Sequence, residues 1–365
     1  MPPEIIRRLA TALEDSSPHD RGRIAKAAKQ LSLAFTSERA AMPLDYLSDP
    51  CALSAYLAVF LIPNAVKVMH CLGQVDTPGD DISVLDIGSG PGTASIAASV
   101  FFSMKQPDAR IRIAAIDRIR PALEKAHELF KKIAPPHHSF ESATLDITKQ
   151  TLQKVLAKQR FDVIIAANVL NELSEDQAFK ISTELARDFL KENGSFIIID
   201  PALRETARPL MKLRDSLVDG GVARVTAPCL HQKQCPMLAA NERDWCHFYI
   251  NWEPPEFLIE LDRLSGMDHT HLKMSYLIFK PANHESPVMS HGLWRVVSSP
   301  LVSKGKRELV LCGKSGELLK VVRLDKNTSQ TNADFDAAKR GDVVSCSCEG
   351  RIDKTNSFEI IRNWG

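Results

Sequence analysis

Three cysteines lie close together in the second half of the chain, in a segment that also carries two histidines. They are Cys229, Cys235 and Cys246, and a proline follows the second of them. Deprotonated thiols bind zinc and iron–sulfur clusters. Structural zinc sites favour cysteines about two to four residues apart, a spacing that this segment lacks. Because a cysteine–proline step is typical of iron–sulfur ligands, the pattern favours an iron–sulfur centre, with zinc as the alternative.

Three cysteines do not complete a four-thiolate centre, so a fourth ligand has to come from elsewhere in the chain. The candidates are His231, His247, Cys312, Cys346 and Cys348. Cys51 and Cys71 lie in an apolar region, where a free thiol behaves as a small apolar side chain. Eight cysteines in 365 residues are too few for a disulfide scaffold, which predicts a reducing compartment. The plainest alternative is that all eight are unligated thiols.

A glycine-rich loop lies in the first half of the chain. Asp-Ile-Gly-Ser-Gly-Pro-Gly at residues 86–92 follows an apolar run and precedes a predicted helix over residues 93–102. Gly88, Gly90 and Gly92 allow close approach of a ligand, and a helix start can bind an anion. Thr93 stands where the dinucleotide fingerprint has its third glycine, which disfavours a dinucleotide. We expect S-adenosylmethionine instead, with its carboxylate at the helix start and its amine near Asp86.

Polar side chains follow the next predicted strands. Asp117 ends the second strand, Asp146 follows the third and Asn168 follows the fourth. Ligands of open α/β sheets bind outside the carboxyl ends of the strands. We therefore expect Asp117 to accept the ribose hydroxyls, Asp146 the adenine amino group, and Asn168 to line the pocket. Each acid alone could be a helix cap or a surface carboxylate, but their shared position favours a cofactor site.

No catalytic residue can be identified. Methyl transfer is an in-line displacement that needs positioning and sometimes a general base. The fourth strand is followed by Asn-Val-Leu-Asn at residues 168–171, where amino-methyltransferases of nucleic acids carry Asn/Asp-Pro-Pro-aromatic. No cysteine stands at the end of the fourth or fifth strand to attack a cytosine. We expect Asn168 and Asn171 to line the pocket or cap a helix, and enzymatic activity stays open.

The composition is that of a folded protein, with 44% hydrophobic and 25% charged residues. Because the net charge is only +1, any nucleic-acid surface has to be local. No apolar run approaches the ~20 residues that span a bilayer. Residues 1–30 lack the apolar core of a signal peptide. We therefore expect a cytoplasmic protein without membrane contact.

The expected fold class is α/β, a Rossmann-like class I S-adenosylmethionine methyltransferase fold with extensions. Its parts are an N-terminal helical region (1–75), the cofactor-binding core (76–200), a cysteine-bearing iron–sulfur insert with the end of the core sheet (201–285), and a β-rich extension (286–365). Apolar runs predict core strands over residues 84–87, 111–116, 161–166 and 196–199.

Local signals place several element boundaries. Ser174 and Gln177 predict a capping box at a helix start, and Gly194 is the expected stop of that helix. Residues 308–312 and 318–324 flank a Gly-containing turn and predict a β-hairpin. Residues 326–332 predict a flexible polar loop.

Five motifs together resemble the small-ribosomal-subunit methyltransferase-like family of ribosome assembly factors, which has mitochondrial and bacterial members. They are the loop at 86–92, Asn-Val-Leu-Asn-Glu-Leu at 168–173, Leu-Arg-Asp-Ser-Leu at 213–217, Ala-Pro-Cys at 227–229 with Cys-Pro at 235–236, and Asp-Trp-Cys-His-Phe at 244–248. The resemblance runs from about residue 44 to about residue 324, and the cysteine segment is its most specific part.

The resemblance implies a 4Fe–4S cluster held by three cysteines of the insert and one of the C-terminal β-region. On this chain the implied ligands are Cys229, Cys235, Cys246 and Cys312. It also implies binding to small-subunit ribosomal RNA and ribosomal proteins during assembly, by a chain that is monomeric off the ribosome. The location would be the bacterial cytoplasm, or the mitochondrial matrix in a eukaryote. An active ribosomal RNA methyltransferase and a zinc-stabilised RNA-binding module are the alternatives.

Two groups of basic residues could supply the RNA-binding surface. They are Arg204, Arg208, Lys212, Arg214 and Arg224 near the insert, and Lys304, Lys306, Arg307, Lys314, Lys320 and Arg323 in the C-terminal strands. Such groups are usually solvated faces. If Cys312 is a ligand, both groups converge and form a phosphate-binding patch. His231, Trp245, His247 and Tyr249 could add base stacking.

Overall fold

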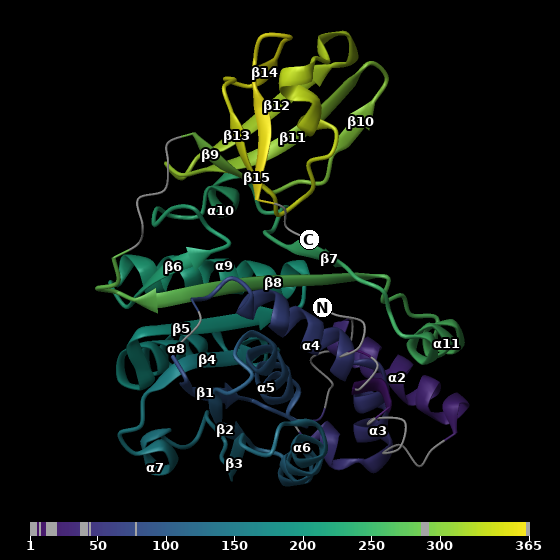
Figure 1. Ribbon diagram of the computed structural model, residues 1–365, viewed down its shortest axis with the longest axis vertical. Coiled ribbons are helices and arrows are strands. Elements are labelled where there is room, and N and C mark those ends of the chain that lie inside the picture. The colour runs from purple at the N-terminus through teal and green to yellow at the C-terminus, as the bar shows by residue number, and fades with distance from the viewer. Residues whose placement is uncertain are drawn as a thin grey trace. The chain divides into compact units, whose positions relative to one another are not determined.

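The computed structural model describes residues 6, 9–11, 20–36, 43, 45–76, 79–285 and 292–362 (Figure 1). The chain divides into two compact units. Unit 1 comprises Met1–Ile199 and Asn251–Leu272, and unit 2 comprises Asp200–Ile250 and Lys273–Gly365. The strand-end carboxylates therefore belong to unit 1, and the cysteine segment belongs to unit 2.

Unit 1 contains a parallel sheet in the order β3-β2-β1-β4-β5. The strands are β1 (Asp81–Ile87), β2 (Arg110–Asp117), β3 (Ser139–Thr144), β4 (Phe161–Ala167) and β5 (Leu190–Asp200). The helices that connect them are α5 (Thr93–Lys105), α6 (Arg120–Ile133), α7 (Gln153–Leu156) and α8 (Glu175–Glu184). Burial on both faces explains why β1, β4 and β5 contain continuous apolar runs, whereas the edge strand β3 is mostly exposed. The expected Rossmann-like α/β class is confirmed, and the strand order reverses between β1 and β4, where such folds bind ligands.

The N-terminal region is helical where it is described, as expected. It contains α2 (Arg21–Thr36), a short 3-10 turn (Tyr46–Ser48), α3 (Pro50–Val59) and α4 (Leu61–Leu72). Helix α11 (Glu256–Ser265), from much later in the chain, packs against α2 through Leu258 and Leu261. No single helix in the described ranges is long and apolar enough to cross a membrane; α3 and α4 pass that test only as a pair, bent by 51°.

The capping box before α8 is confirmed, because the Ser174 Oγ accepts the Gln177 N–H and the Gln177 Oε1 accepts the Ser174 N–H, both at 3.2 Å. The stop expected at Gly194 is wrong. The α-helix ends at Glu184, a π-turn follows to Phe189, and Gly194 lies inside β5. A Cβ at Gly194 would lie 2.9 Å from the Phe161 carbonyl oxygen, so the glycine permits close strand approach.

Unit 2 begins with α9 (Arg204–Asp219), β6 (Ala223–Ala227), the short α10 (Pro236–Ala240) and β7 (Phe248–Asn251). Strand β8 (His271–Pro281) pairs with β6 in an antiparallel manner and also pairs with β7. The cysteine segment forms the connections between β6, α10 and β7.

The C-terminal part of unit 2 is a separate sheet in the order β14-β12-β11-β9-β13-β15, with β10 paired to β11. Its strands are β9 (Leu293–Val296), β10 (Leu301–Ser303), β11 (Lys306–Gly313), β12 (Leu318–Leu324), β13 (Val343–Cys346), β14 (Arg351–Ile352) and β15 (Phe358–Arg362). Strands β11 and β12 pair antiparallel from Lys306 with Leu324 to Cys312 with Leu318, which confirms the expected hairpin.

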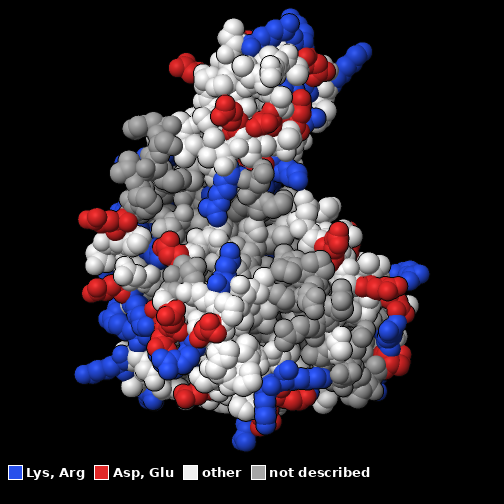
Figure 2. Space-filling model, in the orientation of Figure 1, with Lys and Arg blue, Asp and Glu red and all other residues white. Residues whose placement is uncertain are grey.

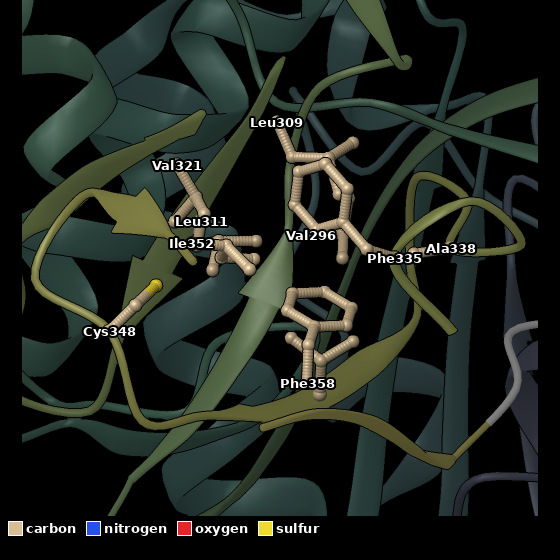
Figure 3. Packing of buried hydrophobic residues seen from close by; sticks show 10 residues of the cluster. Val296, Leu309, Leu311, Val321, Phe335, Ala338, Cys348, Ile352 and Phe358 are labelled. Carbon is tan, nitrogen blue, oxygen red and sulfur yellow. The ribbon is translucent and has the colours of Figure 1, made fainter. Parts of the chain in front are cut away.

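The core of this sheet closes around two aromatic rings (Figure 3). Phe335 and Phe358 are buried, and their ring centroids lie 5.0 Å apart in an edge-to-face arrangement. The flexible loop expected over residues 326–332 is wrong. The segment forms 3-10 turns, and Asn332 is fully buried, with its Nδ2 donating to the carbonyls of Asn327 and Asp353.

Replacing Phe335 by Ala should destabilise this sheet by about 3–5 kcal/mol, because it removes a fully buried ring and leaves a cavity. Hydrogen–deuterium exchange over residues 292–362 would measure the loss of protection. Ile361→Ala, at a position that is 54% exposed, is the control and should change protection little. Equal effects of the two substitutions would contradict this packing.

Candidate functional site

The three loop glycines all have positive φ angles, of 65°, 52° and 82° at Gly88, Gly90 and Gly92. A Cβ at Gly88 would lie 2.4 Å from the Val169 Cγ2, and one at Gly92 would lie 2.9 Å from the Ala126 Cβ. Gly90 differs, since its nearest neighbour would be the Leu47 Cδ1 at 3.6 Å. Packing against neighbouring elements therefore accounts for Gly88 and Gly92, whereas Gly90 is buried but less tightly packed, and its positive φ is the reason for a glycine there.

Asp86 ties the end of β1 to the start of α5. It is 1% exposed, and its Oδ2 accepts the backbone N–H and the hydroxyl of Ser95 at 2.8 and 2.7 Å. Burial raises the pKa of Asp86 to about 7, and the nearby Asp117 adds to the increase, although the bonds from Ser95 oppose it. Asp86 therefore holds the start of α5 through Ser95, and its expected contact with the cofactor amine stays a prediction.

Asp117 lies across the loop from Asp86, at the end of β2. Its Oδ2 accepts the Gly90 N–H and its Oδ1 accepts the Ile119 N–H, both at 2.8 Å. Burial raises the pKa of Asp117, while these two hydrogen bonds act in the opposite direction. Each carboxylate oxygen has a second lone pair, so the side chain keeps its capacity to accept hydroxyls. The hydroxyl of Ser89 is buried and has no hydrogen-bond partner among the described residues, which leaves a donor for a ligand at this loop.

Asp146 and Asn168 follow β3 and β4, as expected. The Asp146 Oδ1 accepts the backbone N–H and hydroxyl of Thr148, at 3.0 and 2.6 Å, so this carboxylate also organises its own turn. Asn168 has a φ of 59°, rare for a residue other than glycine, and its N–H donates to the Ile199 carbonyl at 2.7 Å. The backbone conformation directs the chain after β4 toward the glycine loop, where Val169 packs on Gly88.

Two further features of this crevice were not anticipated from the sequence. Arg118 and Glu172 form a partly buried ion pair at 2.7 Å, which connects the segments that follow β2 and β4. The only sequence signal was a charged residue directly after β2 and another in the short turn that follows β4. The N-terminal elements also reach the crevice, because Leu47 packs against Ile119 beside Tyr46 and Tyr56.

Tyr56 extends the polar lining of the crevice. Burial raises the pKa of Tyr56, while hydrogen bonds with Thr93 and Asn64 act against that increase. Asn64 also accepts a hydrogen bond from the Lys67 Nζ at 3.1 Å.

The structure brings together the four cysteines that the family resemblance implied. Cys229 follows β6, Cys235 caps α10, Cys246 precedes β7, and Cys312 lies in β11. Burial raises the pKa of Cys246, and the thiols of the other three add to the increase. Burial likewise raises the pKa of Cys312, with contributions from Cys229 and Cys235, and burial and Cys229 raise the pKa of Cys235 to about 11. Every pair within this cysteine cluster therefore lies within electrostatic reach.

The pocket around the cysteine cluster is largely apolar. The side chains that form it are Met211, Met237, Leu238, Trp245, Val297, Val310 and Leu318. The backbone N–H of Cys235 donates to both carboxylate oxygens of Asp215 at 3.0 Å. The turn of the β11–β12 hairpin packs on the same segment, because a Cβ at Gly316 would lie 2.7 Å from the Lys233 Cβ. Cys235, Cys246 and Cys312 pack against these apolar side chains, and free thiols are the type of donor that iron–sulfur clusters use.

The other candidate ligands differ in their surroundings. The His231 Nε2 lies 3.5 Å from the Cys312 Sγ, whereas His247 stacks on Trp245 at 5.2 Å. Cys346 and Cys348 belong to the core of the C-terminal sheet, where the Cys348 N–H donates to the Cys346 Sγ at 3.4 Å. Over the described ranges, no three His, Cys, Asp or Glu side chains are arranged to hold a metal ion.

Several of the basic residues expected in the RNA-binding patch are buried or paired with acidic side chains. Arg214 and Arg323 are 1% and 3% exposed, so the expectation that they face RNA is wrong. Lys306 and Lys320 both pair with Glu308, at 2.6 and 2.8 Å. On the face seen in Figure 2, basic and acidic side chains are interspersed. Arg214 and Arg323 bind carbonyl and carboxylate groups within the protein. The spacing of residues in the sequence does not reveal such partners.

Replacing Asp86 by Asn should flatten the pH dependence of unfolding. An aspartate has a pKa of about 3.9 when unfolded, so between pH 4 and 7 the folded state holds more protons and its stability falls as pH rises. Chemical denaturation at pH 5 and pH 8 should show a loss smaller by about 3 kcal/mol in the variant. Asp108→Asn, at an exposed position, is the control. An unchanged pH dependence in Asp86→Asn would exclude a buried, protonated Asp86.

Comparison with known proteins places these features in a family. The model of the family described as mitochondrial small ribosomal subunit Rsm22 matches residues 73–344. A curated relative, the mitochondrial ribosome assembly protein RSM22 of Saccharomyces cerevisiae (strain ATCC 204508 / S288c), is 23% identical over 186 aligned residues. That alignment covers 35% of this chain and 30% of the relative, so the matched part is less than a third of the relative's length.

Solved structures show weaker similarity. The fibrillarin/Nop5p complex is 14% identical with a TM-score of 0.36, covering 60% of this chain and 83% of that one. The methyltransferase domain of bacterial CtHen1-C is 14% identical with a TM-score of 0.37, covering 60% and 98%. Precorrin-6y C5,15-methyltransferase from Geobacter metallireducens GS-15 is 17% identical with a TM-score of 0.34, covering 60% and 87%. At TM-scores this low, the similarity supports no inference about the chemistry of this protein.

The family match extends through the glycine loop, the cysteine segment and β11, and it covers more than half of the chain. It confirms the resemblance found in the motifs: the chain belongs to the Rsm22 family of the mitochondrial small ribosomal subunit.

Proposed function

We propose that this protein is an assembly factor of the small ribosomal subunit that binds S-adenosylmethionine, carries an iron–sulfur cluster and contacts ribosomal RNA. The observation that carries the proposal is the approach of four cysteine thiols from four separate segments: Cys235, Cys246 and Cys312 pack on one apolar cluster, and Cys229 lies within electrostatic reach of all three. Membership of the Rsm22 family supports the ribosomal assignment.

The cofactor would lie at the switch point of the unit 1 sheet. The nearest neighbour of a Cβ at Gly90 would lie 3.6 Å away, so this part of the loop is less tightly packed than Gly88 and Gly92, and Asp117 has acceptor capacity for the ribose hydroxyls. Asp86 would meet the amine of the cofactor, Asp146 its adenine, and Asn168 would line the pocket. Ser89 would donate its unpartnered hydroxyl. Bound S-adenosylmethionine supplies a methyl group activated for transfer. None of these side chains is assigned as a general base, so the proposal does not require turnover.

The proposed ligands of the 4Fe–4S cluster are Cys229, Cys235, Cys246 and Cys312. Four thiolates are the usual ligand set of such a cluster. The cluster would connect the insert to β11, and its binding free energy would become folding free energy for both segments. Zinc held by three of the cysteines and His231 is the alternative, because the His231 Nε2 lies next to the Cys312 thiol.

Ribosomal RNA and ribosomal proteins of an assembly intermediate are the proposed partners, met in a bacterial cytoplasm or a mitochondrial matrix. The curated relative is named as a mitochondrial ribosome assembly protein, which supports this class of partner. Lys212 and Lys304 are exposed, unlike the buried Arg214 and Arg323, and are the proposed phosphate contacts.

Replacing Gly90 by Val should weaken S-adenosylmethionine binding about tenfold or more, because a branched side chain at φ 52° strains the loop and covers its backbone. Isothermal titration calorimetry measures the affinity, and circular dichroism verifies the fold. Gly79→Val adds the same side chain at an exposed glycine with no neighbour within 4 Å and should bind normally. Wild-type affinity in a folded Gly90→Val protein would rule out this loop as the cofactor site.

Replacing Cys312 by Ser should remove iron and acid-labile sulfide from protein purified without oxygen. Cys346→Ser, a change in the neighbouring sheet core, should retain both. Stoichiometric zinc without sulfide in the wild type would support the zinc alternative. A Cys312→Ser protein with full iron content would show that another residue completes the site.

Pull-down of the wild-type protein from cells, followed by RNA sequencing, tests the ribosomal part of the same proposal. Immature small-subunit RNA should be enriched, and less of it should be recovered with Cys312→Ser, because the C-terminal sheet would lose its connection to the insert. Recovery of transfer RNA alone would point to a different substrate class.

A further inference from the structure

Arg214 is a charged side chain buried directly beneath the cysteine segment. It lies on α9 and is 1% exposed. Its guanidinium donates to the carbonyl oxygens of His231, at 2.6 Å, and Lys233. Both carbonyls belong to the stretch between Cys229 and Cys235, so Arg214 determines the path of the chain between two proposed ligands.

The guanidinium of Arg214 is only partly neutralised by its neighbours. One Nη donates to the Asp215 carboxylate at 2.7 Å, and that carboxylate also accepts the Cys235 N–H. Arg214 further makes a hydrogen bond with the Cys229 thiol. Its Nε is buried and has no hydrogen-bond partner among the described residues. A buried N–H without an acceptor costs about 1–3 kcal/mol, which indicates that an acceptor belongs in this pocket.

A second buried arginine approaches Cys229 from the C-terminal sheet. Arg295 lies in β9 and is 6% exposed. Its Nε donates to the Pro228 carbonyl at 3.0 Å and its Nη1 to the Gly341 carbonyl at 2.5 Å. Cys229 and Cys246 are both among the groups that interact electrostatically with Arg295. Two guanidinium groups from different elements, α9 and β9, therefore interact with Cys229.

We propose that Arg214 and Arg295 are positioning residues for an anionic, thiolate-bound centre at Cys229. The two guanidinium groups donate hydrogen bonds to backbone carbonyls and so hold the segment around Cys229. Their positive charges offset the excess negative charge of the ligated thiolates. The inference rests on the proposed iron–sulfur cluster and adds the groups that tune it. Net charge and hydrogen bonds to the sulfurs set the reduction potential of such clusters. Because reduction adds a negative charge, nearby guanidinium groups favour the reduced state and raise the potential.

The proposal is tested with Arg214→Met, Arg214→Lys and Arg295→Met, compared with Arg243→Met. Arg243 is an exposed cation of the same unit, three positions before Cys246. Iron and sulfide content is measured first on protein purified without oxygen, and the reduction potential is then followed by electron paramagnetic resonance. Loss of iron to a chelator gives a second readout that does not require a fully loaded variant.

The two buried-arginine Met variants should have lower reduction potentials than the wild type and should release iron several-fold faster. Arg214→Lys should have a potential and a release rate between those of Arg214→Met and the wild type. Arg243→Met should match the wild type in both quantities. A purely structural role would change iron release without changing the potential of the clusters that remain, and would overturn the charge argument. Wild-type potentials and release rates in both Met variants would overturn the whole inference while leaving the cluster in place. A wild-type protein without iron and sulfide would instead refute the proposed function itself.

Discussion

The approach of four thiols from separate segments of unit 2 is the interaction on which the proposed function depends. The sulfurs come from the segment after β6, the start of α10, the segment before β7 and the end of β11, and three of them pack on one apolar cluster. Burial and mutual repulsion raise the pKa of three of them, so that the protonated thiols are favoured until a metal replaces the protons. A centre bound at these thiols would supply free energy that this insert, which has little regular structure, cannot obtain from its own hydrogen bonds.

The crevice in unit 1 follows a different principle, because hydrogen bonds between carboxylates and backbone groups already organise it. Asp86 holds the start of α5 and Asp117 holds Gly90, so the loop is formed before any ligand arrives. The N-terminal elements lie over this loop through Leu47 and Tyr56. Preorganisation of this kind lowers the entropy cost of binding and is compatible with a cofactor that has a structural role.

Sequence patterns anticipated those parts of the fold that depend on local signals. Continuous apolar runs identified the core strands, Ser174 and Gln177 identified a helix start, and a Gly-containing turn identified the β11–β12 hairpin. Gly194 was misread because a glycine that permits strand contact looks the same in sequence as a helix stop. Arg214 and Arg323 were misread because their partners, the carbonyls of residues 231 and 233 and the Asp336 carboxylate, are recognisable only in three dimensions. The placement of Cys312, rather than Cys346 or Cys348, beside the insert required the family resemblance, since the spacing alone left all three open.

The most direct test of a shared metal centre is differential cysteine alkylation, read out by mass spectrometry, of protein kept free of oxygen. Cys229, Cys235, Cys246 and Cys312 should be protected together, and all four should become reactive in parallel when the metal is removed with a chelator. Alkylation of Cys312 at the rate of an unligated thiol, while the other three stay protected, would contradict a centre that joins the insert to β11.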